Sequence, residues 1–275
     1  MLIAIRVFYT IALGLFAAGT VIYLRAFSQR VPGPRRPRAL VVSYGVLFQL
    51  IGLAMYTIYL HQAPFLGMFQ GLVFASFVLG LLFLMTARVL EDERSVGIII
   101  LPLICLFQLS GIFTPLEYVD DPSLSPNPWF ILHASVALFS YGAFCISFAA
   151  AVLYLLLHRQ IKGKHLGRIF ERLPSLGELD YLTYRSVSIG FIGLTLSIAF
   201  GMVWTQLHLG KLLQGDSKEI ITLVNWMVYA LYLHSRFYRG WQGKRSAVLA
   251  ILGFVVLIFN FVFVTVLLSR THAYL

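Results

Sequence analysis

The sequence predicts an all-α membrane protein, a polytopic transmembrane bundle of about eight helices. Charged residues make up only 12% of the 275 residues and hydrophobic residues 59%, whereas a soluble domain usually carries about 25% charged residues. Apolar runs of about 20 residues recur along the chain, and each can cross a hydrocarbon core of roughly 30 Å as a helix. Because lipid offers the backbone no hydrogen-bond partners, these runs are expected to be helical.

Proline, glycine and charged residues separate the apolar runs. The predicted spans are residues 3–24, 39–60, 64–87, 96–113, 130–157, 184–206, 220–235 and 247–269. We expect the first span to be retained, because it is too long for the apolar core of a signal peptide and lacks a clear cleavage site. Together the spans predict one integral-membrane domain over residues 1–275. They can be paired four plus four, although no internal repeat stands out.

The distribution of basic residues predicts the topology. All but four of the 21 Lys and Arg residues lie in or beside the first, third, fifth and seventh loops; the four are Arg6, Lys211, Lys218 and Arg270. By the positive-inside rule the odd-numbered loops are cytoplasmic and both termini are extracytoplasmic. The net charge of +10 therefore sets orientation and does not indicate a nucleic-acid partner.

Both cysteines lie inside apolar runs. Cys105 and Cys145 are not part of a CxxC motif, so the chain encodes neither a thiol-disulfide relay nor a covalently attached c-type haem. We expect both thiols to be small packing groups.

The predicted topology sorts the seven histidines by depth. His133 lies at the outer end of the fifth span, and His272 just beyond the outer end of the eighth. Two histidines at one depth on different helices can bind one metal ion from opposite faces, as bis-imidazole ligation of haem iron requires. His234 lies within the seventh span, where a buried imidazole indicates either a functional site or a core residue. The remaining four are expected in loops: His61 and His208 outside, His158 and His165 inside.

Two further patterns concern the last helices. In the seventh span Thr222, Asn225, Tyr229 and Tyr232 share one stripe, and His234 points roughly to the opposite side. Asp216 precedes this span, where a carboxylate either caps the helix or contacts a polar ligand, with capping favoured.

Several segments resemble CcsA-type cytochrome c assembly proteins. They are Gly201–Trp204, Asp216–Glu219, Trp226–Arg236, Arg239–Trp241 and Thr271–Tyr274. The triplet His133-Ala-Ser, followed by Phe139-Ser-Tyr141, matches the family's preceding helix. The resemblance covers most of the chain and is strongest from His133 onward.

The resemblance implies a site for haem b that is held non-covalently and transiently. The resemblance implies that His133 and His272 are the external axial ligands of the iron. It implies that His234 is the intramembrane histidine of a second haem site. The resemblance also implies that Asp216 closes an external haem-binding loop that begins at Trp204. Other loop positions that the family fills with tryptophan are here Leu209, Leu213 and Gly215. In this loss of tryptophans the chain is also similar to the HemX- and YpjD-like branch.

Three functions follow as hypotheses. The first is haem handling or delivery for cytochrome c assembly in the bacterial cytoplasmic (inner) membrane. Its partners would be lipid, a larger membrane protein of the assembly machinery and apocytochrome c, and the chain would act as a haem chaperone and not as a stand-alone enzyme. The alternative is a HemX-type membrane regulator of tetrapyrrole biosynthesis that acts on a cytoplasmic enzyme through residues 159–172. A third, a secondary transporter, predicts broken helices and midplane charges, and neither pattern is clear.

Overall fold

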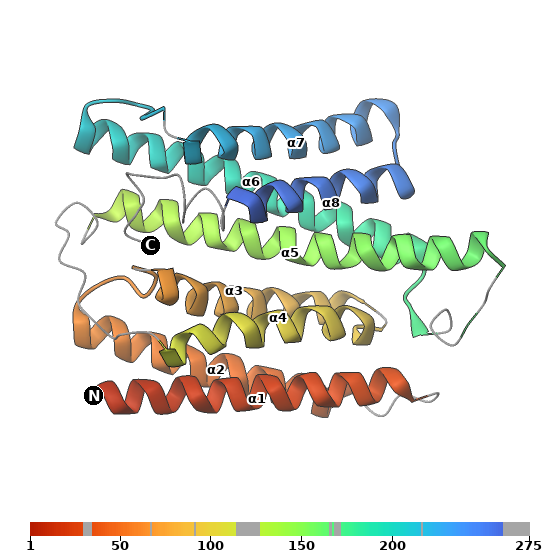
Figure 1. Ribbon diagram of the computed structural model, residues 1–275, viewed down its shortest axis with the longest axis horizontal. Helices are drawn as coiled ribbons and strands as arrows, with labels where there is room; N and C mark the ends of the chain where they lie inside the picture. Colours follow the sequence, from red (N-terminus) through yellow and green to blue (C-terminus); the bar gives the residue numbers. More distant parts are fainter. Residues whose placement is uncertain are drawn as a thin grey trace. The chain divides into compact units, whose positions relative to one another are not determined.

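The computed structural model consists of helices. It describes residues 1–29, 35–66, 68–90, 92–113, 127–164, 167, 172–215 and 217–260, and in these residues we find no strand. The helices are α1 (Leu2–Ser28), α2 (Arg35–Leu60), α3 (Met68–Val89), α4 (Arg94–Phe113), α5 (Pro128–Lys162), α6 (Leu176–Leu209), α7 (Ser217–Arg239) and α8 (Lys244–Ile258) (Figure 1). The prediction of an all-α fold with about eight helices is confirmed.

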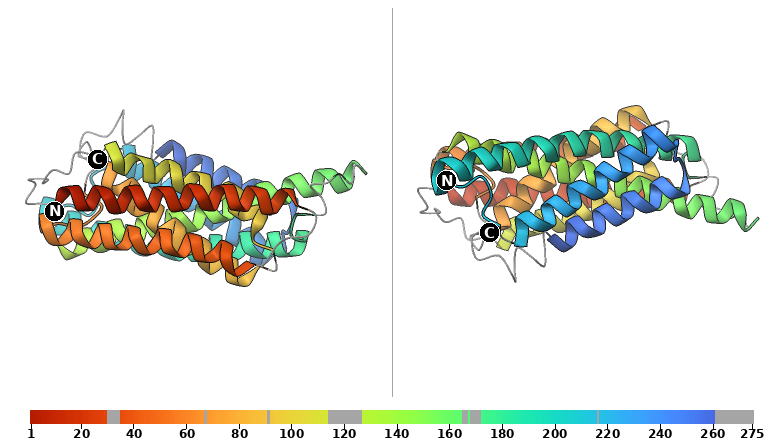
Figure 2. Two further views of the ribbon diagram at one scale, coloured as in Figure 1. Left: turned by 90° about the horizontal axis from the view of Figure 1, so that it is seen from below. Right: turned by 90° about the horizontal axis from the view of Figure 1, so that it is seen from above.

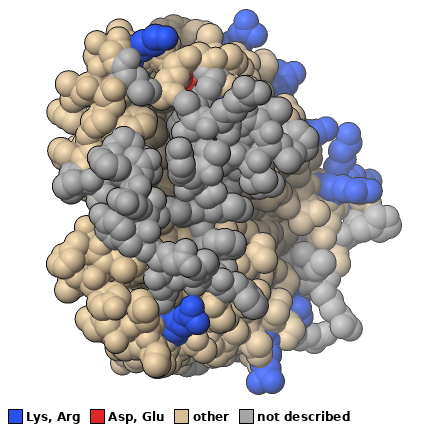
Figure 3. All heavy atoms as spheres, turned by 60° about the vertical axis from the view of Figure 1, so that its left-hand side comes forward, with Lys and Arg blue, Asp and Glu red and all other residues tan. Residues whose placement is uncertain are grey.

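Five helices are long and apolar enough to cross a membrane: α1, α2, α3, α5 and α6. The apolar part of α4, Arg94–Leu109, is shorter, and the described part of α8 has 15 residues. On the face drawn in Figure 3, few of the described side chains are charged, and Lys and Arg outnumber Asp and Glu. These features confirm a polytopic membrane protein, while the extracytoplasmic position of both termini stays a prediction.

Several helix ends differ from the predicted spans. Helix α3 begins at Met68 and not at residue 64, because Ala63–Leu66 forms a turn in which Leu66 N donates to Ala63 O. Helix α6 begins at Leu176, ahead of the predicted residue 184, since Glu178 and Asp180 lower the hydropathy of a segment that is nevertheless helical. Helix α5 runs on to Lys162 and extends past the ends of α6, α7 and α8 (Figure 2). The outer part of the eighth span, residues 261–269, lies outside the described residues.

The contacts of the chain divide it into two compact units. Unit 1 comprises Met1–Asp120 and Gly163–Ser175 and holds α1–α4; unit 2 comprises Asp121–Lys162 and Leu176–Leu275 and holds α5–α8. This division agrees with the four-plus-four pairing of the apolar runs. The single membrane domain over residues 1–275 remains a prediction.

A polar network lies in the core of unit 1. The Gln49 amide nitrogen lies within hydrogen-bond distance of Val73 O (2.8 Å), Ser76 Oγ (2.5 Å) and Gln108 Oε1 (2.6 Å), which share its two hydrogens. Gln108 in turn donates to Tyr9 O (3.2 Å), so the network joins all four helices. The side chains of Gln49, Ser76 and Gln108 are fully buried. Hydrogen bonds of this kind hold helices together where both lipid and core are apolar.

We therefore expect Gln49→Leu to destabilise unit 1. The substitution removes the shared donor and leaves the acceptors Ser76 Oγ and Gln108 Oε1 without it, at a cost of about 1–2 kcal/mol. Unfolding of the full chain in detergent, followed by circular dichroism, measures the effect. The matched control is Gln206→Leu, which changes an exposed glutamine of α6 and should leave stability unchanged. Equal effects of the two substitutions would contradict the assignment.

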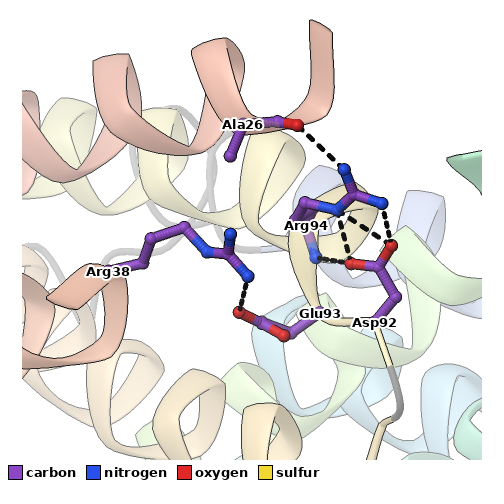
Figure 4. Close-up of polar contacts among 5 residues, drawn as sticks. All are labelled: Ala26, Arg38, Asp92, Glu93 and Arg94. Carbon is purple, nitrogen blue, oxygen red and sulfur yellow. Dashed lines mark hydrogen bonds and ion pairs between the residues drawn. The ribbon is translucent and has the colours of Figure 1, made fainter. Parts of the chain in front are cut away.

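Two ion pairs close one end of unit 1 (Figure 4). Arg38 at the start of α2 pairs with Glu93 (3.2 Å), and both side chains are buried. Arg94 pairs with Asp92 through its Nε (2.8 and 2.9 Å) and Nη2 atoms, and its Nη1 donates to Ala26 O (2.8 Å) at the end of α1. The loop before α4 is thus attached to both α1 and α2.

Asp92 gives this end of the unit an acid-sensitive contribution to stability. Burial alone would raise its pKa, but the hydrogen bonds and charge of Arg94 outweigh burial and lower the pKa. A carboxyl group with a lowered folded-state pKa stabilises the fold above its unfolded pKa, and that contribution is lost as the pH falls through the folded value. We expect Asp92→Asn to lower stability by about 1 kcal/mol at neutral pH. The difference between the thermal melts of the two proteins should shrink as the pH falls below about 4; a constant difference would refute this.

Unit 2 is built on the pair α5 and α6, with α7 and α8 packed beside them. Ser140 Oγ of α5 donates to Gly190 O of α6 (2.5 Å). The rings of Phe144 in α5 and Tyr229 in α7 stack at 3.7 Å between centroids. Ser140 and Ser147 are fully buried, so the helical face of α5 that also carries His133 is turned inward. Cys145 is buried as well, in agreement with the predicted packing role.

Candidate functional site

The start of α5 is fixed just ahead of His133. Asn127 Oδ1 accepts hydrogen bonds from Trp129 N (2.9 Å) and Phe130 N (3.3 Å), and Pro128 occupies the first position of the helix. Asparagine as N-cap followed by proline is a strong helix-start signal, because it satisfies the free amides and presets the backbone. His133 therefore lies in the second turn of a well-defined helix.

His133 is held against α6 by mutual hydrogen bonds. Its Nδ1 lies 2.7 Å from Ser197 O, and since a carbonyl oxygen only accepts, Nδ1 carries the proton. Ser197 Oγ donates to His133 O (3.0 Å) in return. A neutral imidazole with its proton on Nδ1 has its lone pair on Nε2, the arrangement that metal-ligating histidines adopt when a carbonyl orients them.

Gly201 makes room for this ring. A Cβ atom on Gly201 would lie 2.8 Å from His133 Nδ1 and 3.0 Å from Cε1. The contact would be with a ring that Ser197 already holds, so the glycine permits the close approach of α6 to the imidazole.

A cavity of about 100 Å³ opens beside His133. Its walls come from α5, α6, α7 and the loop between α6 and α7, and include Tyr141, Trp204, Lys218 and Thr222. Pockets that enclose a whole ligand are usually about 300–1,000 Å³, so a macrocycle does not fit inside. The cavity is instead large enough for a ligand group to reach the His133 imidazole from the rim.

The loop at the rim is attached to both helices that it connects. Thr205 Oγ1 of α6 donates to Leu212 O (3.0 Å). The carboxylate of Glu219, in the first turn of α7, accepts from Gln214 N and Gly215 N (2.8 Å each). Gly215 has a φ of 75°, in the left-handed region that favours glycine. Asp216, for which helix capping was predicted, lies outside the described residues.

Trp204 is the second predicted site residue at this cavity. Its ring lies 5.3 Å from the Phe130 ring and 5.8 Å from the His208 ring, measured between centroids. The structure therefore brings His133 and Trp204 together, and both line one cavity. His272 lies outside the described residues, so the predicted pair of axial ligands stays a prediction.

His234 lies elsewhere on unit 2. It is 12 residues beyond the cavity residue Thr222 on the same helix, about 18 Å along the axis. Its side chain is exposed and stacks on Tyr238 with 4.5 Å between ring centroids. The stripe of Asn225, Tyr229 and Tyr232 is buried, so α7 turns this polar stripe into the bundle and His234 away from it. His234 is therefore not a core residue, and its role in a second site remains a prediction.

A partly buried group of polar contacts fixes this rotation of α7. Asp180 of α6 accepts two hydrogen bonds from Arg236 (3.0 and 2.7 Å) and one from Gly243 N (2.9 Å). The Arg236 guanidinium also lies 4.6 Å from the centroid of the Tyr184 ring. No role was predicted for Asp180 from the sequence. The sequence signal that could have indicated it is an acidic residue at a helix end that is otherwise rich in basic residues.

The comparisons with known proteins agree with the fold and the predicted family. Residues 41–272 match the family described as "Cytochrome C assembly protein". The chain belongs to this family. The predicted resemblance to CcsA-type proteins is thereby confirmed.

Named relatives place this family member beside cytochrome c biogenesis proteins. It is 33% identical over 237 residues to the cytochrome c biogenesis protein CcsA of Guillardia theta, covering 77% of this chain and 76% of the relative. Identity to the CcsA of Chlamydomonas reinhardtii is 30% over 217 residues, or 77% of this chain and 60% of that one. The chain thus spans less than two thirds of the length of the Chlamydomonas relative.

A solved structure shares the fold. The cytochrome c haem lyase CcmF superposes with a TM-score of 0.69 at 16% sequence identity, covering 99% of this chain and 47% of CcmF. At this identity the similarity supports the helical architecture alone.

Proposed function

We propose that this protein binds haem b non-covalently and holds it for delivery during cytochrome c assembly in the bacterial cytoplasmic membrane. One observation carries the proposal: His133 is seated with Nδ1 on Ser197 O, so that Nε2 can act as a ligand, beside a cavity that Trp204 also lines. Family membership supports the cytochrome c assembly role.

The residues at the cavity suit one axial ligand of haem iron. An imidazole nitrogen is a common haem ligand, and the cavity is too small to surround the macrocycle. The haem would therefore lie at the outer rim, with His133 on one side of the iron and His272 proposed for the other. His234 would serve a separate site further along α7.

The chain's own part in this function is binding and orientation. Bound haem would supply vinyl groups for thioether bonds to the cysteines of apocytochrome c. His133 would hold the iron, Ser197 and Gly201 would fix the ring, and the attached loop before α7 would shape the rim. Apocytochrome c and a larger membrane protein of the assembly machinery are the proposed partners.

Purification of the full chain in neutral detergent tests the proposal. Haem should co-purify or bind on addition of haemin, with the absorption spectrum of a six-coordinate, bis-imidazole species. Expression in a strain that lacks its own CcsA-type protein should restore c-type cytochromes. Absence of haem binding together with failure to complement would overturn the proposal.

The regulatory function remains a second candidate because Leu213 and Gly215 stand where related loops carry tryptophan. It predicts that neutralising Arg159, Lys162 and Lys164 changes the cellular level of the first enzyme of tetrapyrrole synthesis, whereas His133→Ala does not. The opposite pattern would exclude it.

A further inference from the structure

An aromatic and basic surface lies where α7 ends and α8 begins. We call it the Trp241 surface and define it by Arg239, Trp241, Lys244 and Arg245. The three basic side chains are exposed. The guanidinium carbons of Arg239 and Arg245 lie 5.9 and 5.5 Å from the centroid of the Trp241 ring, which is within the range of cation–π contacts. Two positive charges thus lie next to the Trp241 indole, and Lys244 adds a third positive charge to the same turn.

The turn that carries this surface is held on both sides. Trp241 N donates to Ser235 O of α7 (3.2 Å), and Ser246 Oγ of α8 donates to Trp241 O (3.0 Å). Gly240 and Gly243 take left-handed φ values of 61° and 69°, which permit the tight turn. Gly243 N is fixed by Asp180 (2.9 Å). The indole is therefore presented by an ordered turn.

The positive charge of the surface has no internal counterion among the described residues. Arg239, Lys244 and Arg245 form no ion pair there, and the carboxylate beside the turn, Asp180, is already bound to Arg236. The first turn of α8 contains no acidic residue. Cations at the start of a helix are disfavoured by its dipole, so a bound anion would relieve this repulsion.

Large apolar side chains adjoin the charges. Phe237 and Tyr238, in the last turn of α7, are 70% and 81% exposed. Exposed aromatic residues at the end of a helix in a membrane protein, followed by an indole and several cations, match the order of acyl chain and phosphate in a lipid. An acidic soluble protein would not require the exposed rings.

We propose that the Trp241 surface binds the phosphodiester headgroup of an anionic phospholipid. The guanidinium groups of Arg239 and Arg245 contact the phosphate, Lys244 adds charge, and Trp241 lies at the level of the headgroup. Phe237 and Tyr238 contact the upper acyl chains. This inference is independent of haem binding.

Native mass spectrometry of the full chain in neutral detergent tests the proposal, with phosphatidylglycerol as the probe and phosphatidylcholine as the neutral comparison. Combining Arg239→Gln, Lys244→Gln and Arg245→Gln should weaken phosphatidylglycerol binding by about tenfold or more, since each basic residue adds to the attraction of an anionic lipid. The matched control combines Arg159→Gln, Lys162→Gln and Lys164→Gln, which removes the same charge from exposed residues at the end of α5 and in the turn that follows it.

The outcomes separate a built site from a general charge effect. A loss in the first variant alone supports the proposal. Equal losses in both variants, equal binding of the neutral lipid, or full competition by inorganic phosphate would overturn it. If the triple variant fails to fold, Trp241→Ala and Trp241→Phe replace it. The alanine variant should lose severalfold in affinity and the phenylalanine variant should keep most of it; equal binding by both would also overturn the proposal.

Discussion

Replacing His133 by alanine is expected to abolish the bis-imidazole haem spectrum and to weaken haem binding by more than about 100-fold. Losing a residue that only orients a metal ligand costs about 10- to 100-fold in affinity, and losing the ligand itself should cost more. The variant should stay folded, since in the described part of the chain the hydrogen bonds of the ring join it to Ser197 alone. Added imidazole should restore the six-coordinate spectrum by entering the space that the side chain leaves.

The control for this prediction is His61→Ala. His61 is exposed and lies in unit 1 at the end of α2, so its removal should leave the spectrum and affinity unchanged. A His133→Ala variant that keeps the wild-type spectrum would show that another group ligates the iron.

Gly201→Ala is expected to weaken haem binding by about 10- to 100-fold without unfolding the protein. The new methyl group would lie 2.8 Å from His133 Nδ1, so the ring must move and its hydrogen bond to Ser197 O is lost. Alanine favours a helix over glycine by roughly 1 kcal/mol, so the unfolding temperature should fall little or not at all. Haemin titration and a thermal melt on the same sample measure both effects.

Gly14→Ala provides the comparison for that substitution. Beyond the adjacent backbone of α1, no atom of the described residues lies within 4 Å of a Cβ at Gly14, so this variant gains helix propensity and should bind haem normally. If Gly201→Ala bound haem as tightly as the wild type, the seating of His133 against α6 would not control ligation.

The fold could be predicted from the sequence because membrane helices are encoded locally. Each apolar run forms a helix whatever its neighbours, and each of the eight predicted spans overlaps one helix, the eighth over its described part. The errors fall at helix ends such as Leu176, where Glu178 and Asp180 interrupt the hydropathy but not the helix. A hydropathy profile identifies the part of a helix that can lie in lipid, whereas the helix itself can continue beyond the lipid boundary. The predicted span is then shorter than the helix.

The candidate site could be predicted only in part. The resemblance to a known family indicated His133 and Trp204, and the structure places both at one cavity. Ser197 and Gly201 were missed because their roles depend on the register of α6 against α5, which periodicity does not determine. Asp180 was missed for the same reason, since its partners Arg236 and Gly243 belong to α7 and the turn before α8.

The hydrogen bond from His133 Nδ1 to Ser197 O fixes the orientation of the imidazole. An imidazole held by the backbone of α6 in this way is a preorganised ligand. Under the proposed function, the rate of haem exchange would then depend on the ligand on the opposite side of the iron and on how easily haem reaches His133 from the rim of the cavity. Such an arrangement suits a carrier that must release what it binds.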